Sequence, residues 1–207
     1  MNVLLTAGAT REPLDAVRFL SNVSTGSTGA ALADALIALG HTVTLLRGEG
    51  AATPSTACEL ETFSSAVNLW ARLERHLCTG KFDAVILAAA VSDYRPENAL
   101  DGKISSDAAT LSLALVRNPK ILPQLKAFSP RALLVVGFKL TVGADAAARR
   151  TAVAAQFAAG GVDCVVQNDL AEIRIAPAHP FRLFRSAEAA PEEIAGAAAL
   201  AERLFKS

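Results

Sequence analysis

Residues 83–90 read DAVILAAA, an apolar run that starts at one charged residue and closes on three alanines. A run of this length without polar alternation is typical of a strand covered on both faces, as in a parallel sheet. Residues 3–6 (VLLT) and 132–138 (ALLVVGF) have the same character. The three runs together predict the centre of a mainly parallel sheet.

Helical patterns alternate with these strands along the chain. We expect further strands at 41–46, 111–116 and 162–167, a hairpin at 173–176 and 181–184, and helices at 29–39, 64–77, 119–127, 144–159 and 191–205. The polar stretch 92–108 is long for a connection and predicts a mobile flap. Strand–helix alternation with right-handed crossovers predicts an α/β, Rossmann-like, doubly wound sheet with helices on both faces. We expect residues 1–207 to form one domain.

The composition argues against several classes of function. Twenty basic and 20 acidic residues cancel, so no strong field attracts nucleic acid or an anionic membrane. The N-terminal MNVLLTAG has no basic segment before its short apolar run, and no apolar stretch approaches the roughly 18 residues that span a bilayer. Three scattered cysteines at 58, 78 and 164 suit a reducing compartment. We therefore expect a cytoplasmic protein.

Ligands in doubly wound sheets bind at the carboxyl ends of the strands, so the loops there are the candidate sites. The loop after residue 6 lacks the G-x-G-x-x-G pattern of dinucleotide-binding enzymes, which argues against an NAD-linked oxidoreductase. Instead STGSTG at 24–29 opens the first helix. Its small residues let backbone N–H groups approach an anion; the alternative is a helix cap with glycines for close packing.

The same loop carries other polar candidates. Arg11 and Arg18 can each grip a carboxylate or phosphate, or form surface ion pairs with Glu12 or Asp15. Asn22 offers both a donor and an acceptor just before the STGSTG turn, or it forms a local Asx turn.

Later loops add further candidates. Ala88, Ala89 and Ala90 leave room for a ligand, and Asp93 can hold a metal ion or a hydroxyl. Lys103 in the flap can offset charge on a triphosphate or be an ordinary solvated lysine. Three more groups follow, each with a purely structural alternative: the helix start at 118–122, Phe138 at a strand end, and Gln167-Asn168-Asp169.

In this order the blocks resemble phosphopantothenate–cysteine ligases, also called phosphopantothenoylcysteine synthetases. The blocks are TAGATREPLDAVRFLSNVSTGSTG at 6–29, AAAVSDYRP at 88–96, KISS at 103–106, NPKIL at 118–122, VGFKLT at 136–141 and NDL at 168–170. The match runs from residue 3 to about residue 173, with the family's spacing.

The resemblance implies a ligase that joins 4′-phosphopantothenate to L-cysteine in coenzyme A biosynthesis. The substrate carboxylate attacks a nucleoside triphosphate, either CTP or ATP with CTP favoured, and the acyl-nucleotide formed is attacked by the amine of cysteine. Mg²⁺ and a homodimer are implied as well. The chain resembles the stand-alone form of the ligase half of a fusion with a flavin-dependent decarboxylase, so we expect no flavin and a separate decarboxylase.

The resemblance also assigns roles to individual positions. It implies Asn22 and Lys103 as catalytic residues, and Asp93 as a magnesium ligand. The positions implied for the other ligands are Arg18, Ser24, Thr25, Gly26, Ala89 and Ala90 for the acid substrate, and Ala88, Asp93, Pro119, Lys120, Ile121, Leu122 and Phe138 for the nucleotide.

The chain departs from the fused bacterial pattern at lysine positions. The residues that stand there instead are Ser27, Ser105, Ser106, Gln156 and Gly160. Arg149 and Arg150, earlier on the same helix, are candidates to replace the lost charge. The alternative function is therefore a degenerate family member that binds phosphopantothenate or nucleotide without catalysis. A short-chain-like reductase is disfavoured, because Tyr94 starts no Tyr-x-x-x-Lys motif.

Overall fold

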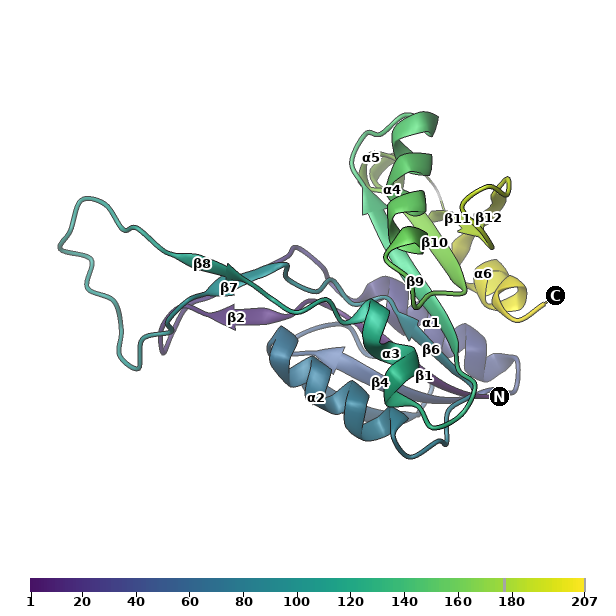
Figure 1. The fold of residues 1–207 in the computed structure, drawn as a ribbon, viewed down its shortest axis with the longest axis horizontal. Coiled ribbons are helices and arrows are strands. Elements are labelled where there is room, and N and C mark those ends of the chain that lie inside the picture. Colours follow the sequence, from purple (N-terminus) through teal and green to yellow (C-terminus); the bar gives the residue numbers. More distant parts are fainter. Residues whose placement is uncertain (177, 207) are drawn as a thin grey trace.

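The computed structural model describes residues 1–176 and 178–206 and is built around one eight-stranded sheet (Figure 1). The strand order is β12-β11-β10-β9-β6-β1-β4-β5. The strands are β1 (Asn2–Ala7), β4 (Thr42–Gly48), β5 (Glu59–Phe63), β6 (Ala84–Leu87), β9 (Leu134–Thr141), β10 (Cys164–Asp169), β11 (Pro180–Phe184) and β12 (Glu192–Ala195). The six strands from β10 to β5 are parallel, and only β11 and β12 at one edge run antiparallel to their neighbours.

Helices cover both faces of the sheet, which confirms the predicted fold class. On one face lie α1 (Ser27–Ala38) and α6 (Gly196–Leu204), and on the other α2 (Ala66–Leu77), α3 (Leu125–Phe128) and α4 (Ala146–Ala158). Successive side chains of β1 point to opposite faces, so Leu5 packs in the α1 layer and Leu4 in the α2 layer. No helix among the described residues is long and apolar enough to cross a membrane.

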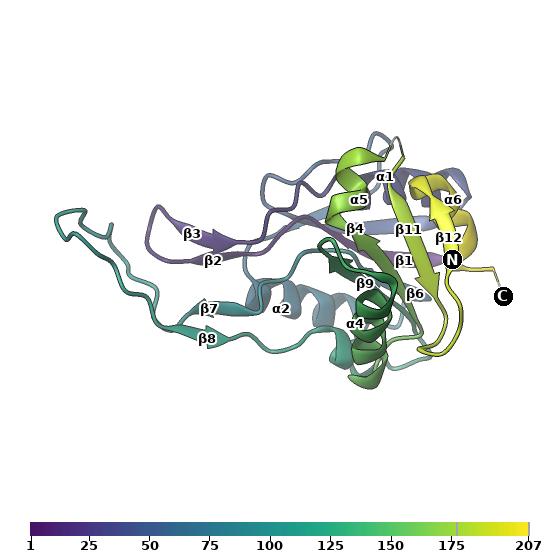
Figure 2. The ribbon, with the colours of Figure 1, turned by 90° about the horizontal axis from the view of Figure 1, so that it is seen from above.

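Two hairpins project from the carboxyl edge of the sheet (Figures 1 and 2). One pairs β2 (Arg11–Pro13) with β3 (Phe19–Ser21), and the other pairs β7 (Tyr94–Pro96) with β8 (Leu115–Arg117). The loop 97–114 forms the far end of the second hairpin and contains most of the predicted flap. The strand predicted at 111–116 is present only as the short β8.

Three predictions near the end of the chain need correction. The hairpin expected between 173–176 and 181–184 is wrong, because Leu170–Ile175 form a helix, α5, and β11 pairs with β12. The side chain of Asp169 accepts the backbone N–H of Ala171 and so starts that helix. The last helix begins at Gly196 rather than 191, since residues 192–195 are taken by β12.

Two other elements also differ from the sequence pattern. The helix expected at 119–127 is a 3-10 turn, η1 (Leu122–Gln124), followed by the short α3. Strand β5 was not predicted, because Glu59 and Leu60 are exposed on this edge strand and give it no apolar run.

Candidate functional site

Three loops meet at the carboxyl edge, and glycines allow them to approach closely. A Cβ atom on Gly8 would lie 2.5 Å from the Cβ of Ala51, and one on Gly26 would lie 2.8 Å from the same atom. Both glycines also have positive φ angles, 84° and 75°. The loop after β1, the start of α1 and the loop after β4 therefore form one tightly packed floor.

A cavity of about 330 Å³ opens above this floor. Of the predicted site residues it contains Asn22 and Ser24. Its remaining lining residues are Ala9, Arg11, Phe19, Ser21, Val23, Glu49, Gly50 and Ala51. The sequence analysis missed residues 49–51, although their position directly after a parallel strand was the available signal.

Arg11 is held inside the cavity wall by two interactions. Its guanidinium lies 3.6 Å from the Glu49 carboxylate and 4.6 Å from the centre of the Phe19 ring. The ion pair that the sequence left open for Arg11 is thus formed with Glu49, which comes from a different loop.

The first turn of α1 keeps free N–H groups for an anion. Among the described residues no side chain caps the helix at Gly26, and the Ser27 N–H makes a 3.3 Å contact with the Thr25 hydroxyl. Ser24 and Thr25 are exposed beside it, whereas Gly26 is buried. The helix start is therefore open toward solvent, as an anion site requires.

Asn22 joins this cavity to the end of β6. Its side-chain amide donates to the Val91 carbonyl at 3.2 Å. The stretch from Ala90 onward is fixed to the loop after β1, because the Ala90 N–H donates to the Gly8 carbonyl at 2.7 Å and the Ser92 N–H donates to the Thr10 hydroxyl at 3.0 Å. Asn22 thus lies directly beside the strand end that carries Ala88, Ala89 and Ala90.

A second cavity, of about 230 Å³, lies just beyond that strand end. Its lining consists of Asp93, Tyr94, Arg117, Asn118 and Lys120. Lys120 Nζ lies 2.5 Å from Asp93 Oδ1, so two predicted nucleotide-binding residues contact each other. The buried Asn118 is the first residue of the candidate segment 118–122; its amide donates to the Ser92 carbonyl at 3.0 Å and supports this wall.

The surroundings of Asp93 limit what could hold a metal ion. Among the residues that the structure describes, no three His, Cys, Asp or Glu side chains form a metal-binding group. Asp93 stands as a lone, exposed carboxylate beside Lys120. This fits Mg²⁺ that enters with a nucleotide and takes one protein carboxylate, because magnesium commonly binds through one or two carboxylates and substrate phosphates.

The predicted nucleotide wall is only partly assembled. The ring of Phe138 packs edge-on against Phe181, 6.3 Å between centres, in the α1 layer of the core. Leu122 belongs to the opposite, α2 layer, where a Cβ on Gly137 would lie 3.0 Å from it. The same position would meet Gln156 Nε2. Gly137, rather than the Phe138 ring, therefore lies beside Leu122, and Gln156 lies next to Gly137.

Lys103 lies apart from both cavities, on the projecting hairpin. Its side chain is exposed, and the residues on either side of it contact the turn between β2 and β3. Arg18 lies in this turn, where its guanidinium donates to Asp15 at 2.6 Å and to the Ile104 carbonyl at 3.2 Å. The structure therefore brings Lys103 and Arg18 into one region, which is distinct from the Asn22 cavity.

A family model matches residues 1–184 of this chain. Its description is "DNA/pantothenate metabolism flavoprotein C-terminal domain". The chain belongs to this family.

Individual relatives agree with the family assignment. The chain is 38% identical over 168 residues to the coenzyme A biosynthesis bifunctional protein CoaBC of Thermococcus kodakarensis, with 81% of this chain and 41% of the relative covered. It is 34% identical over 173 residues to CoaBC of Bacillus subtilis, with 82% and 40% covered. The chain thus spans about two fifths of the length of these relatives.

Several solved structures share the fold. The DNA/pantothenate metabolism flavoprotein of Streptococcus pneumoniae superposes with a TM-score of 0.85 at 24% identity, covering 99% of this chain and 96% of that one. The C-terminal domain of a CoaBC protein gives 0.75 at 25%, covering 99% and 91%. A Cab2 mutant in complex with phosphopantothenate-cysteine gives 0.76 at 20%, covering 94% and 79%.

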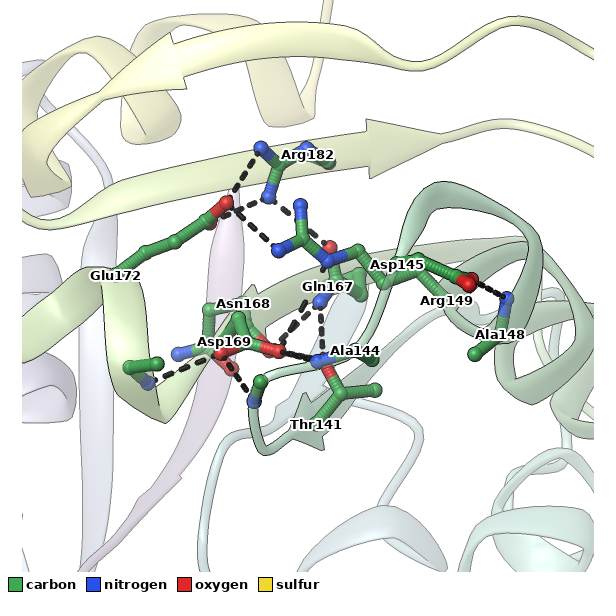
Figure 3. Close-up of polar contacts among 12 residues, drawn as sticks. Thr141, Ala144, Asp145, Ala148, Arg149, Gln167, Asn168, Asp169, Glu172 and Arg182 are labelled. Atoms are coloured by element: carbon green, nitrogen blue, oxygen red, sulfur yellow. Dashed lines mark hydrogen bonds and ion pairs between the residues drawn. The ribbon is translucent and has the colours of Figure 1, made fainter.

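In this flavoprotein C-terminal domain, the block NDL at 168–170 organises the loops beyond β9 and β10 (Figure 3). Asp169 accepts hydrogen bonds from the Thr141 hydroxyl at 2.6 Å and from the N–H groups of Gly143 and Ala144 at 2.8 and 3.0 Å. Burial raises the pKa of the Asp169 carboxyl, but these hydrogen bonds outweigh it and hold the pKa well below its ordinary value. The turn chemistry considered for this block is thus its structural role.

Arg149 is part of the same network and is not free to replace a lost lysine. Its guanidinium lies 2.8 Å from Glu172, which also binds Arg182 at 2.7 Å (Figure 3). Arg150, one residue on, donates only to the Glu188 carbonyl at 3.5 Å. The proposed compensation by Arg149 therefore finds no support in the geometry of this domain.

His179 is a polar residue of this domain that the sequence did not single out. Its Nδ1 lies 3.3 Å from the Thr28 hydroxyl in the first turn of α1, and its Nε2 lies 2.9 Å from the Asn168 amide. Burial lowers the pKa of the imidazole, so the neutral ring that can accept from Asn168 is favoured. His179 thereby ties the helix start to the end of β10.

Proposed function

We propose that this chain joins 4′-phosphopantothenate to L-cysteine at the expense of a nucleoside triphosphate, as a ligase of coenzyme A biosynthesis. The family assignment supports this proposal, as do the relatives named for coenzyme A biosynthesis and the Cab2 structure that holds phosphopantothenate-cysteine. The strongest structural support is the position of Asn22. It lines the first cavity, and its amide donates to the Val91 carbonyl beyond the end of β6.

The first step requires cationic groups around a triphosphate. A carboxylate oxygen of phosphopantothenate attacks the α-phosphorus, an O–P bond forms, and the bond to pyrophosphate breaks. Lys120, exposed at the second cavity, would contact the phosphates after exchanging its Asp93 partner for them. Lys103, exposed on the flap, would offset the negative charge that develops on the leaving pyrophosphate.

The second step needs a held acyl-nucleotide. The nitrogen of the cysteine amine attacks the acyl carbon, a C–N bond forms, the C–O bond to the nucleoside monophosphate breaks, and the amine loses a proton to solvent. With one N–H bound to Val91, Asn22 retains a second N–H and a carbonyl oxygen to orient the intermediate. The free N–H groups at the start of α1 would bind a phosphate nearby.

Magnesium, when bound, would neutralise triphosphate charge and would be held by Asp93 together with the nucleotide itself. We favour CTP over ATP as the nucleotide. Gln156 is the residue to examine for this choice, because its amide lies beside Gly137, which adjoins Leu122 of the predicted nucleotide wall.

We also propose that the chain acts as a homodimer. Large apolar side chains are exposed on the two projecting hairpins: Val17, Phe19, Leu20, Tyr94, Leu111, Leu113 and Leu115. A projection with this much apolar surface is suited to pairing with a second copy of the same chain.

A degenerate binding protein is the second candidate, favoured by one observation. The guanidinium of Arg149 is engaged by Glu172, so that, of the two candidate arginines on helix α4, Arg150 is left to supply charge in place of the family lysines. This protein would bind phosphopantothenate yet release no pyrophosphate.

Pyrophosphate release distinguishes the two candidates. The purified chain is incubated with 4′-phosphopantothenate, cysteine, Mg²⁺ and either CTP or ATP, beside Lys103→Ala and Asn22→Asp. We expect release that depends on phosphopantothenate, is faster with CTP, and falls about 100-fold or more in Lys103→Ala. The Asn22→Asp variant should accumulate the acyl-nucleotide. Binding of phosphopantothenate without any release would favour the degenerate protein instead.

A further inference from the structure

The exposed Lys103 sits between two residues whose backbones are fixed. The Gly102 carbonyl accepts from the Ala16 N–H at 3.2 Å. The Ile104 N–H donates to Asp15 Oδ2 at 2.9 Å, and the Ile104 carbonyl accepts from Arg18 at 3.2 Å. The flap is therefore attached to the β2–β3 turn on both sides of this lysine.

Asp15 is the centre of this attachment, and its two carboxylate oxygens accept hydrogen bonds from different donors. Oδ1 accepts from the N–H groups of Val17 and Arg18 at 2.8 and 2.7 Å and so folds its own turn. Oδ2 accepts from the Arg18 guanidinium at 2.6 Å and reaches across to the Ile104 N–H. The Asp15 side chain is fully buried although its turn lies on a projecting hairpin.

We propose that Asp15 is a positioning residue for the ligase, and that it fixes Lys103 by clamping the flap backbone at Ile104. This inference rests on the proposed function for its catalytic part, and on the geometry alone for the clamp. The clamp favours the charged carboxylate. The hydrogen bond from the Ile104 N–H lowers the pKa of Asp15 most, and burial raises it. Further hydrogen bonds from Val17 and Arg18 bring the pKa to about 2.

The geometry defines a precise disruption of the clamp. In Asp15→Asn only one side-chain oxygen remains as an acceptor. If it stays with Val17, the new NH₂ group faces the Ile104 N–H and the Arg18 guanidinium, which are also donors. If the amide turns over, the turn loses its acceptor instead. Either orientation weakens the attachment of the flap with almost no change in side-chain volume.

Trypsin reports on the clamp independently of catalysis. Lys103 is the only lysine or arginine between Arg95 and Arg117, so cleavage within the hairpin occurs after Lys103. Cleavage in a held segment follows the population of its open state. We expect Asp15→Asn to be cut at Lys103 about tenfold faster than wild type, because hydrogen bonds to a charged group are among the stronger ones.

The matched control is Asp34→Asn. Asp34 lies on α1 and also accepts backbone N–H groups, from Ser55 and Thr56 at 2.9 and 2.7 Å, and neither donor belongs to the hairpins. The Asp34→Asn substitution should leave both the rate of trypsin cleavage at Lys103 and the rate of pyrophosphate release unchanged. Circular dichroism of each variant verifies folding.

Catalysis gives the second measurement. Asp15→Asn should lower kcat for pyrophosphate release at least tenfold while the nucleotide KM stays within about twofold. In a Lys103→Ala background the same substitution should have little further effect on kcat, because Asp15 acts through that lysine. A structural role without connection to Lys103 would lower kcat equally in both backgrounds.

The wild-type chain supplies a measurement that needs no variant. Amide exchange at Ile104 should be slower than at Lys103 and Ser105, whose N–H groups find no acceptor among the described residues. The proposal would be overturned by equal exchange at the three amides or by unchanged trypsin cleavage in Asp15→Asn. It would also be overturned if Asp15→Asn lowered kcat as much in the Lys103→Ala background as in the wild type. If wild type releases no pyrophosphate, the ligase assignment fails while the trypsin and exchange results still decide the clamp.

Discussion

At the scale of single residues, buried carboxylates decide where the loops of this protein lie. Asp169 is fully buried at the end of β10 yet is held in its charged form by hydrogen bonds from Thr141, Gly143 and Ala144. These bonds close the loop between β9 and α4 over the sheet edge. A buried charge of this kind stabilises the fold only while all its donors remain in place.

We expect Asp169→Asn to reduce the free energy of unfolding by about 2 kcal/mol at pH 7, because one of the acceptor sites becomes a donor facing N–H groups. Asp145→Asn, in the same loop, is the control. Asp145 accepts only the Ala148 N–H at a helix start, where asparagine serves equally well, so its effect should stay within about 0.5 kcal/mol. Urea denaturation of the two variants measures both values.

The pH dependence of the Asp169 contribution follows from the direction of its shift. The folded-state pKa lies below the ordinary value of 3.8, so the stabilisation is complete above that value and is lost as the pH falls below it. The stability difference between wild type and Asp169→Asn should therefore shrink below about pH 4. A difference that persisted undiminished at pH 3 would contradict a role for the charge.

At the scale of elements, the site depends on three loops that touch through glycine. The start of α1 lies against the loop after β1 and the loop after β4, with Gly26 at the junction. The free N–H groups of the helix can face an anion only if this junction keeps its close approach.

Gly26→Ala should disturb this junction for two separable reasons. The φ angle of 75° is unfavourable for alanine, and the new Cβ would lie 2.8 Å from the Ala51 Cβ and 3.1 Å from the Gly8 nitrogen. We expect a loss of about 1–3 kcal/mol in unfolding free energy and a higher KM for phosphopantothenate.

Gly40→Ala separates the two reasons. Gly40 has a φ of 84°, but a Cβ there would meet nothing within 4 Å, so it reports the backbone cost alone. Adding Ala51→Gly to Gly26→Ala should recover part of the excess loss. Thermal unfolding of the four proteins tests this, and equal losses for Gly26→Ala and Gly40→Ala would show that the contact is unimportant.

At the scale of the whole molecule, the projecting hairpins determine how a second copy could bind. They carry exposed leucine, valine and aromatic side chains and extend well away from the sheet (Figures 1 and 2). Each hairpin forms a two-stranded sheet of its own. Burial of the apolar side chains against a partner would stabilise the hairpins that carry Arg18 and Lys103.

Sedimentation velocity should therefore show a species of twice the 21.5 kDa chain mass at micromolar concentration. Leu20→Glu, which places a charge on the exposed face of β3, should raise the dimer dissociation constant about tenfold or more. Val67→Glu is the control, since Val67 is also exposed (55%, against 37% for Leu20) but lies on α2 beside the sheet body. A wild-type chain that stays monomeric at all concentrations would contradict the dimer proposal.

The sequence alone predicted the central parallel strands, except β5, and their alternation with helices along the chain. Apolar runs such as residues 83–90 report burial on both faces directly, because a parallel strand has no solvent-facing side to interrupt the run. The same local signals located Asn22, Asp93 and Lys120 at the carboxyl edge, where strand ends and turn residues are recognisable from composition.

Tertiary structure decided what depends on pairing between distant segments. The Asp15 carboxylate meets Ile104 across 89 positions, and Thr28 meets His179 across 151. Residues 192–195, which the sequence pattern predicted as helix, form strand β12 because they pair with the edge of β11. Phe138 points into the core rather than toward Leu122, because strand alternation and its neighbour Phe181 fix its face. The local sequence pattern shows whether a segment has the apolar period of a helix or of a strand. Which other segment it pairs with is decided by the three-dimensional packing of the whole chain.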